Sequence, residues 1–115
     1  MEIGYNGVLM RIYVSESHRF RGKPLFRALM EAMLAAGFSG ATAFPGAEGY
    51  WEGRRLSSDK AVEAPGDLPI VIEVAESEER LRGFLPALES MLGDGFVTVE
   101  RVAVARYRSG HLLDR

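Results

Sequence analysis

The sequence predicts a single α+β domain in which a four-stranded antiparallel sheet carries two helices on one face. Three observations point to this fold. Some segments alternate apolar and polar residues as strands do, and others place apolar residues at helical spacing. Their order along the chain is β-α-β, a long connection, then β-α-β again. Right-handed crossovers then place the first and third strands in the middle of the sheet.

The first β-α-β unit lies before the long connection. Alternating apolar residues predict a strand over Gly7–Ser15. Pro24, which suits a first helical turn, precedes an apolar stripe that predicts a helix over about residues 24–36. Gly37 fits the left-handed position that ends such a helix. The small and β-branched residues of 40–44 then begin the second strand.

The second unit repeats the pattern. Residues 68–75 alternate clearly and predict the third strand. Ser77 is a candidate N-cap for the second helix. Pro86 lies inside the apolar stripe of that helix, so we expect a kink there, or a helix proper that begins near Phe84. Gly93 then ends the helix.

The last strand is predicted over residues 96–108. Its valines change parity at Glu100–Arg101, and a bulge or break at that point would explain the change. Residues 109–115 are expected to form a frayed, flexible tail. The whole chain, residues 1–115, is therefore one domain.

The sheet face without helices carries a mixture of apolar and charged side chains. Arg11 and Glu73 lie on it, on the two central strands, where they can pair with each other. Leu9, Tyr13 and Val71 share this face. An apolar face of this size needs covering, so we expect the chain to form oligomers through it.

Composition excludes several classes of function. The net charge of −2 gives no general attraction to nucleic acid, and the absence of cysteine excludes disulfides and thiol chemistry. No apolar run is long enough to insert in a membrane, and the first residues do not form a secretory signal. We therefore expect a cytoplasmic protein. His18 and His111 have no second ligand at metal-binding spacing, so no metal site is predicted.

The long connection, Pro45–Gly66, is the least regular part of the chain. Connections of this length are usually functional or disordered. It contains four glycines and the only tryptophan, Trp51, followed by Arg54 and Arg55. Tyr50 and Trp51 could stack on a ligand or partner, or could anchor the connection on its own domain.

Two sets of cationic residues are candidates for anion binding. Gly22 and Lys23 precede a helix start, where backbone donors and the helix dipole favour an anion, although a solvated loop is the commoner outcome. The second set is suited to phosphate if its members converge in space, and otherwise is ordinary surface charge: Arg54, Arg55, Lys60, Arg101, Arg106 and Arg108. No nucleophile, base and acid are paired in the sequence, so no catalytic residues are assigned.

Several segments taken together carry a family resemblance. They are GVLMRIYVSES, GKPLF, GAEGYW, LPIVIEV, and the GDG, FVTVE and RY of the ending. In combination they resemble the PII-like proteins of domain of unknown function family 190, over nearly the whole chain. The resemblance implies a ferredoxin-like fold assembled as a homotrimer with the sheets turned inward. It also implies that residues 46–66 correspond to the T-loop, with which PII proteins grip their partners.

The resemblance further implies a ligand site between subunits, in which an adenine nucleotide such as ATP, ADP or AMP would bind. Its parts would be the base of the long connection, the turn before the last strand and the C-terminal segment. By position these are Gly46, Glu48, Gly49, Arg54, Arg55, Gly93, Asp94, Gly95, Arg106 and Arg108. The turn lacks the flanking arginine and lysine that bind phosphates in signalling PII proteins, so the trimer is better supported than the nucleotide.

The implied function is that of a non-enzymatic regulator, which signals through the long connection to a protein partner such as a membrane transporter or an enzyme. One alternative is a small-molecule enzyme, with Glu48 or Glu73 as base and Arg11 or Arg55 as anion binder. The other is a trimer resembling the CutA metal-tolerance proteins, against which the shortage of histidine and the absence of cysteine argue.

Overall fold

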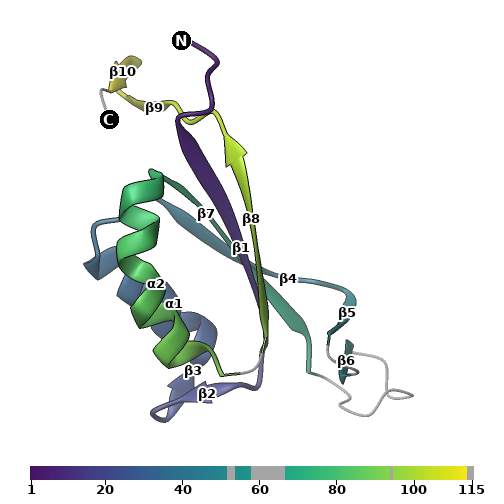
Figure 1. Ribbon diagram of the computed structural model, residues 1–115. Helices are drawn as coiled ribbons and strands as arrows, with labels where there is room; N and C mark the ends of the chain where they lie inside the picture. The colour runs from purple at the N-terminus through teal and green to yellow at the C-terminus, as the bar shows by residue number, and fades with distance from the viewer. Residues whose placement is uncertain (52–53, 58–66, 94, 114–115) are drawn as a thin grey trace.

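The protein is an α+β domain with one main sheet and two helices. The computed structural model describes residues 1–51, 54–57, 67–93 and 95–113, with only the backbone of 54–57. The main elements are β1 (Gly7–Ser15), α1 (Leu25–Ala35), β4 (Ala41–Pro45), β7 (Pro69–Glu76), α2 (Glu78–Leu92) and β8 (Phe96–Val102). The sheet is antiparallel in the order β4-β7-β1-β8, and both helices cover one face of it (Figure 1). The predicted central position of the first and third strands is confirmed.

The core lies between the sheet and the two helices. The alternating apolar residues predicted for the first strand are buried, as are those of the third, because each set faces the helices. They form one continuous cluster with the apolar stripes of both helices, whose buried members are Leu25, Leu29, Met33, Leu81, Phe84 and Leu88. All of this core lies on one side of the sheet.

Helix α1 begins and ends close to the predicted residues. Pro24 is its N-cap residue, and Gly37 follows its end with a φ of +85°. The amide of Phe38 donates to the carbonyl of Met33 over 3.1 Å, which closes the last turn. The Phe38 ring then contacts Phe84 of α2 edge to face, with 5.3 Å between centroids, so the end of α1 is tied to the second helix.

Helix α2 differs from one of the two expectations stated for it. Ser77 is its N-cap, as predicted, and its hydroxyl accepts from the amide of Arg80 over 3.2 Å. The helix starts there rather than near Phe84 and continues through Pro86. It tolerates this proline because Pro86 and Arg82, whose carbonyl loses its donor, both lie on the exposed side, where water can satisfy that carbonyl.

The last strand also differs from its prediction. Strand β8 pairs with β1 without a bulge, from Phe96 opposite Tyr13 to Val102 opposite Gly7, so the break predicted at Glu100–Arg101 is wrong. The chain leaves the sheet after Val102 instead. There the side-chain amide of Asn6 donates to the carbonyl of Val104 (3.0 Å) and accepts from its amide (2.7 Å). The parity change therefore reflects the end of the strand pairing.

Beyond β8 the chain forms a hairpin of β9 (Arg106–Arg108) and β10 (His111–Leu113). Ser109 and Gly110 join the two strands with φ values of +52° and +79°, as in a tight two-residue turn. The segment 109–115 was expected to be a frayed tail, but it contains this turn and β10 up to Leu113. We call residues 1–6 and 103–113 the distal arm, because Figure 1 shows them beyond the end of the sheet, with the β9–β10 hairpin on the side of the helices.

The distal arm makes the molecule long. The Cα atoms extend over 48 × 26 × 26 Å, with a radius of gyration of 15.7 Å. A compact domain of this length has a radius of gyration of about 13 Å. The arm therefore projects past the body of its own domain.

Two smaller hairpins occupy segments that were predicted to be irregular. One joins β2 (Arg19–Phe20) and β3 (Lys23–Pro24) before α1. The other joins β5 (Glu48–Trp51) and β6 (Arg54–Ser57) within the long connection, where Tyr50 pairs with Arg55 and Trp51 with Arg54. Lys60 and the rest of 58–66 lie outside the described residues. The first part of the long connection is thus a regular hairpin.

Candidate functional site

The sheet face without helices, here called the open face, is apolar across all four strands at one level. The strand register places four side chains in one row: Phe44, Val71, Tyr13 and Phe96. The rings of Tyr13 and Phe96 stack with 4.5 Å between centroids and 13° between planes. Phe44 and Phe96, at the two ends of this row, remain 39% exposed. The row is therefore an apolar surface that the chain itself leaves partly uncovered.

The next two rows of the open face carry charge, with Arg11 opposite Glu73 in one and Glu100 opposite Leu9 in the other. The Arg11 Nε lies 2.8 Å from an oxygen of Glu73, and its Nη1 lies 2.8 Å from an oxygen of Glu100. Hydrogen bonds to Glu73 and then Glu100 raise the pKa of Arg11. The predicted pairing of Arg11 with Glu73 is confirmed, and Glu100 is a third member that the sequence did not reveal. We call these three residues the Arg11 trio, which has a net charge of −1.

The base of the long connection is fixed against the start of β7. The amide of Gly46 donates to the carbonyl of Pro69 over 2.8 Å, and a Cβ at Gly46 would lie 3.1 Å from the ring of that proline. Glycine at position 46 therefore allows the chain to pass close to Pro69. Gly49 lies against the same ring, whereas Glu48 is exposed.

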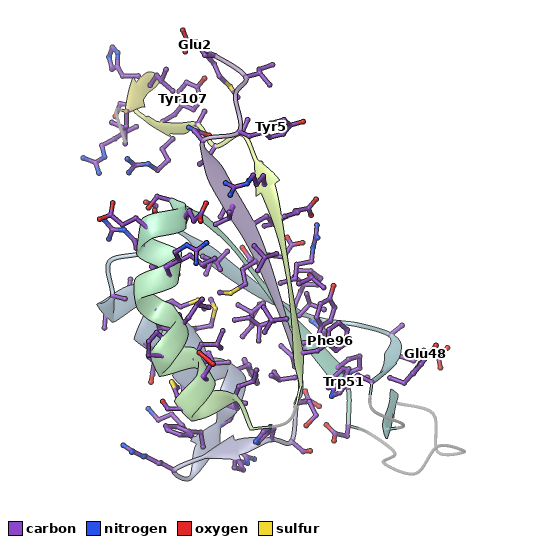
Figure 2. All side chains as sticks on the ribbon, viewed as in Figure 1. Glu2, Tyr5, Glu48, Trp51, Phe96 and Tyr107 are labelled. Atoms are coloured by element: carbon purple, nitrogen blue, oxygen red, sulfur yellow. The ribbon has the colours of Figure 1, made fainter. Side chains whose placement is uncertain are left out.

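Strand β5 then crosses the end of the open face to reach β8. Trp51 is only 8% exposed, and its ring contacts Phe96 edge to face, with 5.9 Å between centroids (Figure 2). Tyr50 beside it is 75% exposed. Of the two interpretations of this aromatic pair, anchoring on the protein's own domain holds for Trp51, while Tyr50 remains available to other molecules.

The only tryptophan of the chain makes this anchor measurable. We expect Phe96→Ala to shift the fluorescence of Trp51 to longer wavelength and to increase its quenching by iodide, because the indole loses its covering ring. Phe44→Ala is the matched control, since Phe44 lies in the same row on the opposite edge strand. Equal spectra for the two variants would show that Phe96 does not hold the hairpin.

The turn before β8 lies at the same end of the sheet. Gly95 has a φ of +142°, and a Cβ there would overlap the carbonyl oxygen of Tyr13. Only glycine fits, because the turn passes directly against the backbone of β1. Gly93 ends α2 with a φ of +61° and lies against the ring of His18, while Asp94 is outside the described residues. This end of the sheet therefore brings the turn near the base of the long connection.

Two buried polar side chains at this end were not singled out from the sequence. Asp67 is 8% exposed and accepts from the amide (3.0 Å) and the hydroxyl (2.6 Å) of Ser17. The Ser15 hydroxyl is buried without a hydrogen-bond partner among the described residues. The only indication in the sequence was their position, since Asp67 precedes β7 and Ser15 is the last residue of β1. They add polar groups to the base of the long connection.

The candidate anion site at the start of α1 is partly occupied by the protein's own groups. Gly22 takes a φ of +84° in the β2–β3 turn. The ammonium of Lys23 lies 2.7 Å from an oxygen of Glu31, and this contact lowers the pKa of Glu31. The amide of Leu25 donates to the carbonyl of His18 over 2.7 Å. An anion here would have to compete with Glu31 for the lysine.

The C-terminal arginines lie at the other end of the molecule. Arg106 and Arg108 are on β9 in the distal arm, where Arg106 donates to the Ser39 hydroxyl over 3.4 Å. Arg101 pairs instead with Glu78 of α2 over 2.8 Å. Hydrogen bonds from Arg82 and then Arg101 lower the pKa of that glutamate. The side chains of Arg54 and Arg55 lie outside the described part of the structure.

The predicted ligand residues therefore form two groups. The glycines of the long connection and of the turn are at one end of the β1–β8 pair, and the β9 arginines are at the other. Figure 2 shows this separation, with Glu48, Trp51 and Phe96 at one end and Tyr5 and Tyr107 at the other. One chain does not bring the two groups into a single site.

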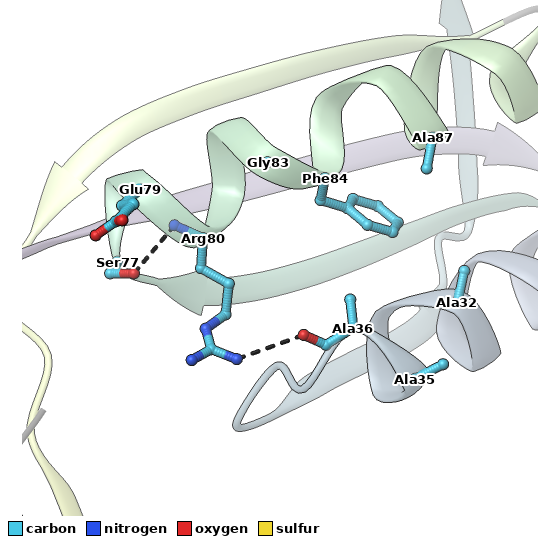
Figure 3. Close-up of a pocket in the computed structure, with 9 residues that line it drawn as sticks. All are labelled: Ala32, Ala35, Ala36, Ser77, Glu79, Arg80, Gly83, Phe84 and Ala87. Atoms are coloured by element: carbon cyan, nitrogen blue, oxygen red, sulfur yellow. Dashed lines mark hydrogen bonds between the residues drawn. The ribbon is translucent and has the colours of Figure 1, made fainter.

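A groove also lies between the two helices, on the outer side of the domain (Figure 3). Its volume is about 780 Å³, and its walls are mostly alanine and glycine. Arg80 crosses one end of it and donates to the carbonyls of Ala36 (3.4 Å) and Gly37 (2.8 Å), which caps the end of α1. None of the predicted ligand residues lines this groove.

Two kinds of feature are absent from the described residues. Among them, no helix is long and apolar enough to span a bilayer. The same part of the chain contains no group of three or more histidine, aspartate or glutamate side chains placed to hold a metal ion.

The fold and its surfaces define a small α+β domain with one uncovered, largely apolar sheet face and a long connection anchored at its end. The chain belongs to the family called domain of unknown function 190, described as an uncharacterized ACR, whose model matches residues 7–104. The resemblance inferred from the sequence is thereby confirmed.

Curated relatives agree with this family. Two UPF0166 proteins of Aquifex aeolicus are similar to the chain, at 33% identity over 96 residues and 32% over 97. Each alignment covers 84% of this chain and 90% and 95% of the respective relative. A UPF0166 protein of Methanocaldococcus jannaschii is 28% identical over 92 residues, which are 79% of this chain and 84% of that protein. The chain thus matches these relatives over most of their length.

Proposed function

We propose that this protein is a PII-like regulatory homotrimer of ferredoxin-like subunits. It binds a small anionic ligand, an adenine nucleotide in the first instance, in the clefts between subunits. The bound ligand orders the long connection, which then contacts a protein partner such as a transporter or an enzyme. The observation that carries this proposal is the position of the predicted ligand residues at two opposite ends of one sheet.

The open face supports assembly. Its apolar row crosses the whole sheet and has no cover from the chain's own helices, which lie on the other face. Inward-turned sheets would remove this row from water. The Arg11 trio lies beside it and would be partly desolvated too, so its hydrogen bonds are needed to offset that cost.

The separation of the ligand residues supports a site between subunits. Gly46 and Gly49 pack against Pro69, and Gly95 packs against the backbone of Tyr13, so the base of the long connection and the turn before β8 both lie at one end of the sheet. Arginine can bind phosphate in a bidentate manner, and Arg106 and Arg108 lie at the other end. A neighbouring copy is therefore needed to bring the second group to the first.

The anchored hairpin supports a signalling role for the long connection. Trp51 fixes one strand of the hairpin on Phe96, while Tyr50 points to solvent and Glu48 is exposed. A ligand at the base would bias this connection only by binding its states unequally. A tenfold bias corresponds to about 1.4 kcal/mol.

The test combines native mass spectrometry with a ligand panel. We expect protein purified without dialysis to appear as a trimer that retains a small ligand. We expect ATP, ADP, AMP or a cyclic dinucleotide to raise the melting temperature and to protect residues 46–66 from protease. A panel that changes neither quantity would refute nucleotide sensing.

A pair of variants makes this test specific. The double substitution Arg106→Ala/Arg108→Ala should abolish the ligand-induced rise in melting temperature while the trimer persists. Arg27→Ala is the control, because Arg27 is an exposed arginine on α1 that belongs to neither ligand group. A similar rise in both variants would remove the β9 arginines from the site.

The enzyme alternative has weaker support from the geometry. Glu73, one of the two candidate bases, accepts a hydrogen bond from Arg11, and Glu48, the other, is exposed. A carboxylate bound by Arg11 and an exposed one are both unlike the enclosed base that such an enzyme needs.

A further inference from the structure

The distal arm exposes a concentration of large apolar side chains. Ile3 is 86% exposed and Tyr5 78%, and Tyr107 on the hairpin is 57% exposed. Met1 and Leu112 add to this surface. Half of the large apolar side chains that are exposed among the described residues therefore lie on this short part of the chain. Isolated exposed apolar residues are ordinary, but a cluster of this kind marks a contact surface.

The arm is a formed element rather than a loose end. The Asn6 side chain makes two hydrogen bonds to the backbone of Val104, which substitute for a rung of the sheet and join the two strands of chain. The turn at Ser109–Gly110 closes the β9–β10 hairpin, in which Leu112 is opposite Tyr107. A preformed surface loses less conformational entropy on binding than a disordered segment does.

The arm is continuous with the open face. It extends directly from β1 and β8, two of the four strands that carry that face. Figure 2 shows Tyr5 projecting away from the helices, toward the side on which Phe96 also lies. A molecule that covers the open face would therefore meet Tyr5 at its edge.

We propose that the distal arm docks on a second copy of this chain and extends the subunit interface beyond the sheet. This inference rests on the homo-oligomer of the proposed function, but it assigns a contact role to residues outside the open face. The side chains concerned are Ile3, Tyr5, Tyr107 and Leu112.

A second copy fits better than an unrelated partner for two reasons. The first is area, because one tyrosine contributes roughly 150–250 Å² and a standard interface takes about 800 Å² from each partner. The two tyrosines of the arm fall short of that value, so a partner must also cover the open face beside them. The second is geometry, since a copy that covers the open face already lies beside the strands that carry the arm.

The experiment compares three proteins by analytical ultracentrifugation over a range of concentrations. They are the unmodified protein, the arm variant Ile3→Glu/Tyr5→Glu, and Leu34→Glu. Leu34 is the matched control, because it is 76% exposed but lies on α1, which covers the other face of the sheet. We expect the arm variant to dissociate at concentrations at least about tenfold higher than the other two, as for loss of interface anchors.

The possible outcomes separate the two proposals. An oligomer that is unchanged by the arm substitutions would overturn the role of the arm and leave the proposed trimer standing. A monomeric unmodified protein would overturn both. If the arm variant fails to fold by circular dichroism, hydrogen exchange of the unmodified protein decides. Residues 3–5 and 107–112 should then exchange more slowly at high protein concentration than after dilution, and equal rates would refute the docking.

Discussion

Alanine in place of Gly95 is expected to lower the free energy of unfolding by about 2–5 kcal/mol. Two effects act together. The φ of +142° is one that residues with a Cβ rarely adopt, and the new Cβ would overlap the carbonyl oxygen of Tyr13. That oxygen belongs to a central strand and cannot move without disturbing the sheet. Urea unfolding followed by circular dichroism, at one fixed protein concentration, measures the change.

A second glycine provides the matched control. Gly83 lies on the exposed side of α2, and nothing stands within 4 Å of the position of its missing Cβ. Gly83→Ala should therefore raise the free energy of unfolding by up to about 1 kcal/mol, because alanine is the better helix former. Opposite signs for the two substitutions are the prediction. A loss at position 83 or no loss at position 95 would contradict the packing described for these sites.

The other large effect concerns assembly. Val71→Glu is expected to convert the proposed trimer into folded monomers at micromolar concentration. Val71 is in the middle of the apolar row, between Phe44 and Tyr13. A carboxylate at this position would be buried without a partner in each subunit, and in a symmetric assembly the copies would also repel one another.

Light scattering coupled to size-exclusion chromatography measures this change. Circular dichroism should show an unaltered secondary structure, since residue 71 lies on the face away from the core. Leu34→Glu adds the same charge to the exposed side of α1 and should leave the mass unchanged. A Val71→Glu protein with the mass of the unmodified one would show that the open face is not the interface.

The sequence predicted the main fold well, because burial on one side leaves a clear period. The alternation of β1 and β7 and the stripes of both helices follow from their contact with a single core. Even Gly37 and Ser77 were recognised, since helix ends need specific residues.

The predictions that were wrong concern segments whose structure depends on tertiary contacts or burial more than on neighbouring residues. The parity change in the last strand indicated a bulge. Instead, the strand ends, and the side chain of Asn6, nearly a hundred residues away, makes hydrogen bonds to the backbone of Val104. Pro86 suggested an interrupted helix, but its exposed position lets water satisfy the freed carbonyl. Neither the Asn6 contact nor this exposure can be read from neighbouring residues.

The candidate site was predictable only in part. The pairing of Arg11 with Glu73 follows from the order of the strands, and it is present. Glu100 was missed because its pairing depends on the register of β8 against β1, which a misplaced bulge would shift. The separation of the β9 arginines from Gly46 depends on the three-dimensional arrangement of the strands, which the sequence alone does not give.

The Arg11 trio also bears on the interval before assembly. In the proposed trimer, each subunit would first have its open face in water, where an apolar row alone would adhere to other apolar surfaces. The trio makes non-specific apolar contacts unfavourable in free energy, because covering three charged groups removes their hydration without supplying new hydrogen bonds. Only a surface that supplies hydrogen bonds for these groups escapes the penalty. The same three residues would thereby protect the free subunit against aggregation and favour binding to the correct partner subunit.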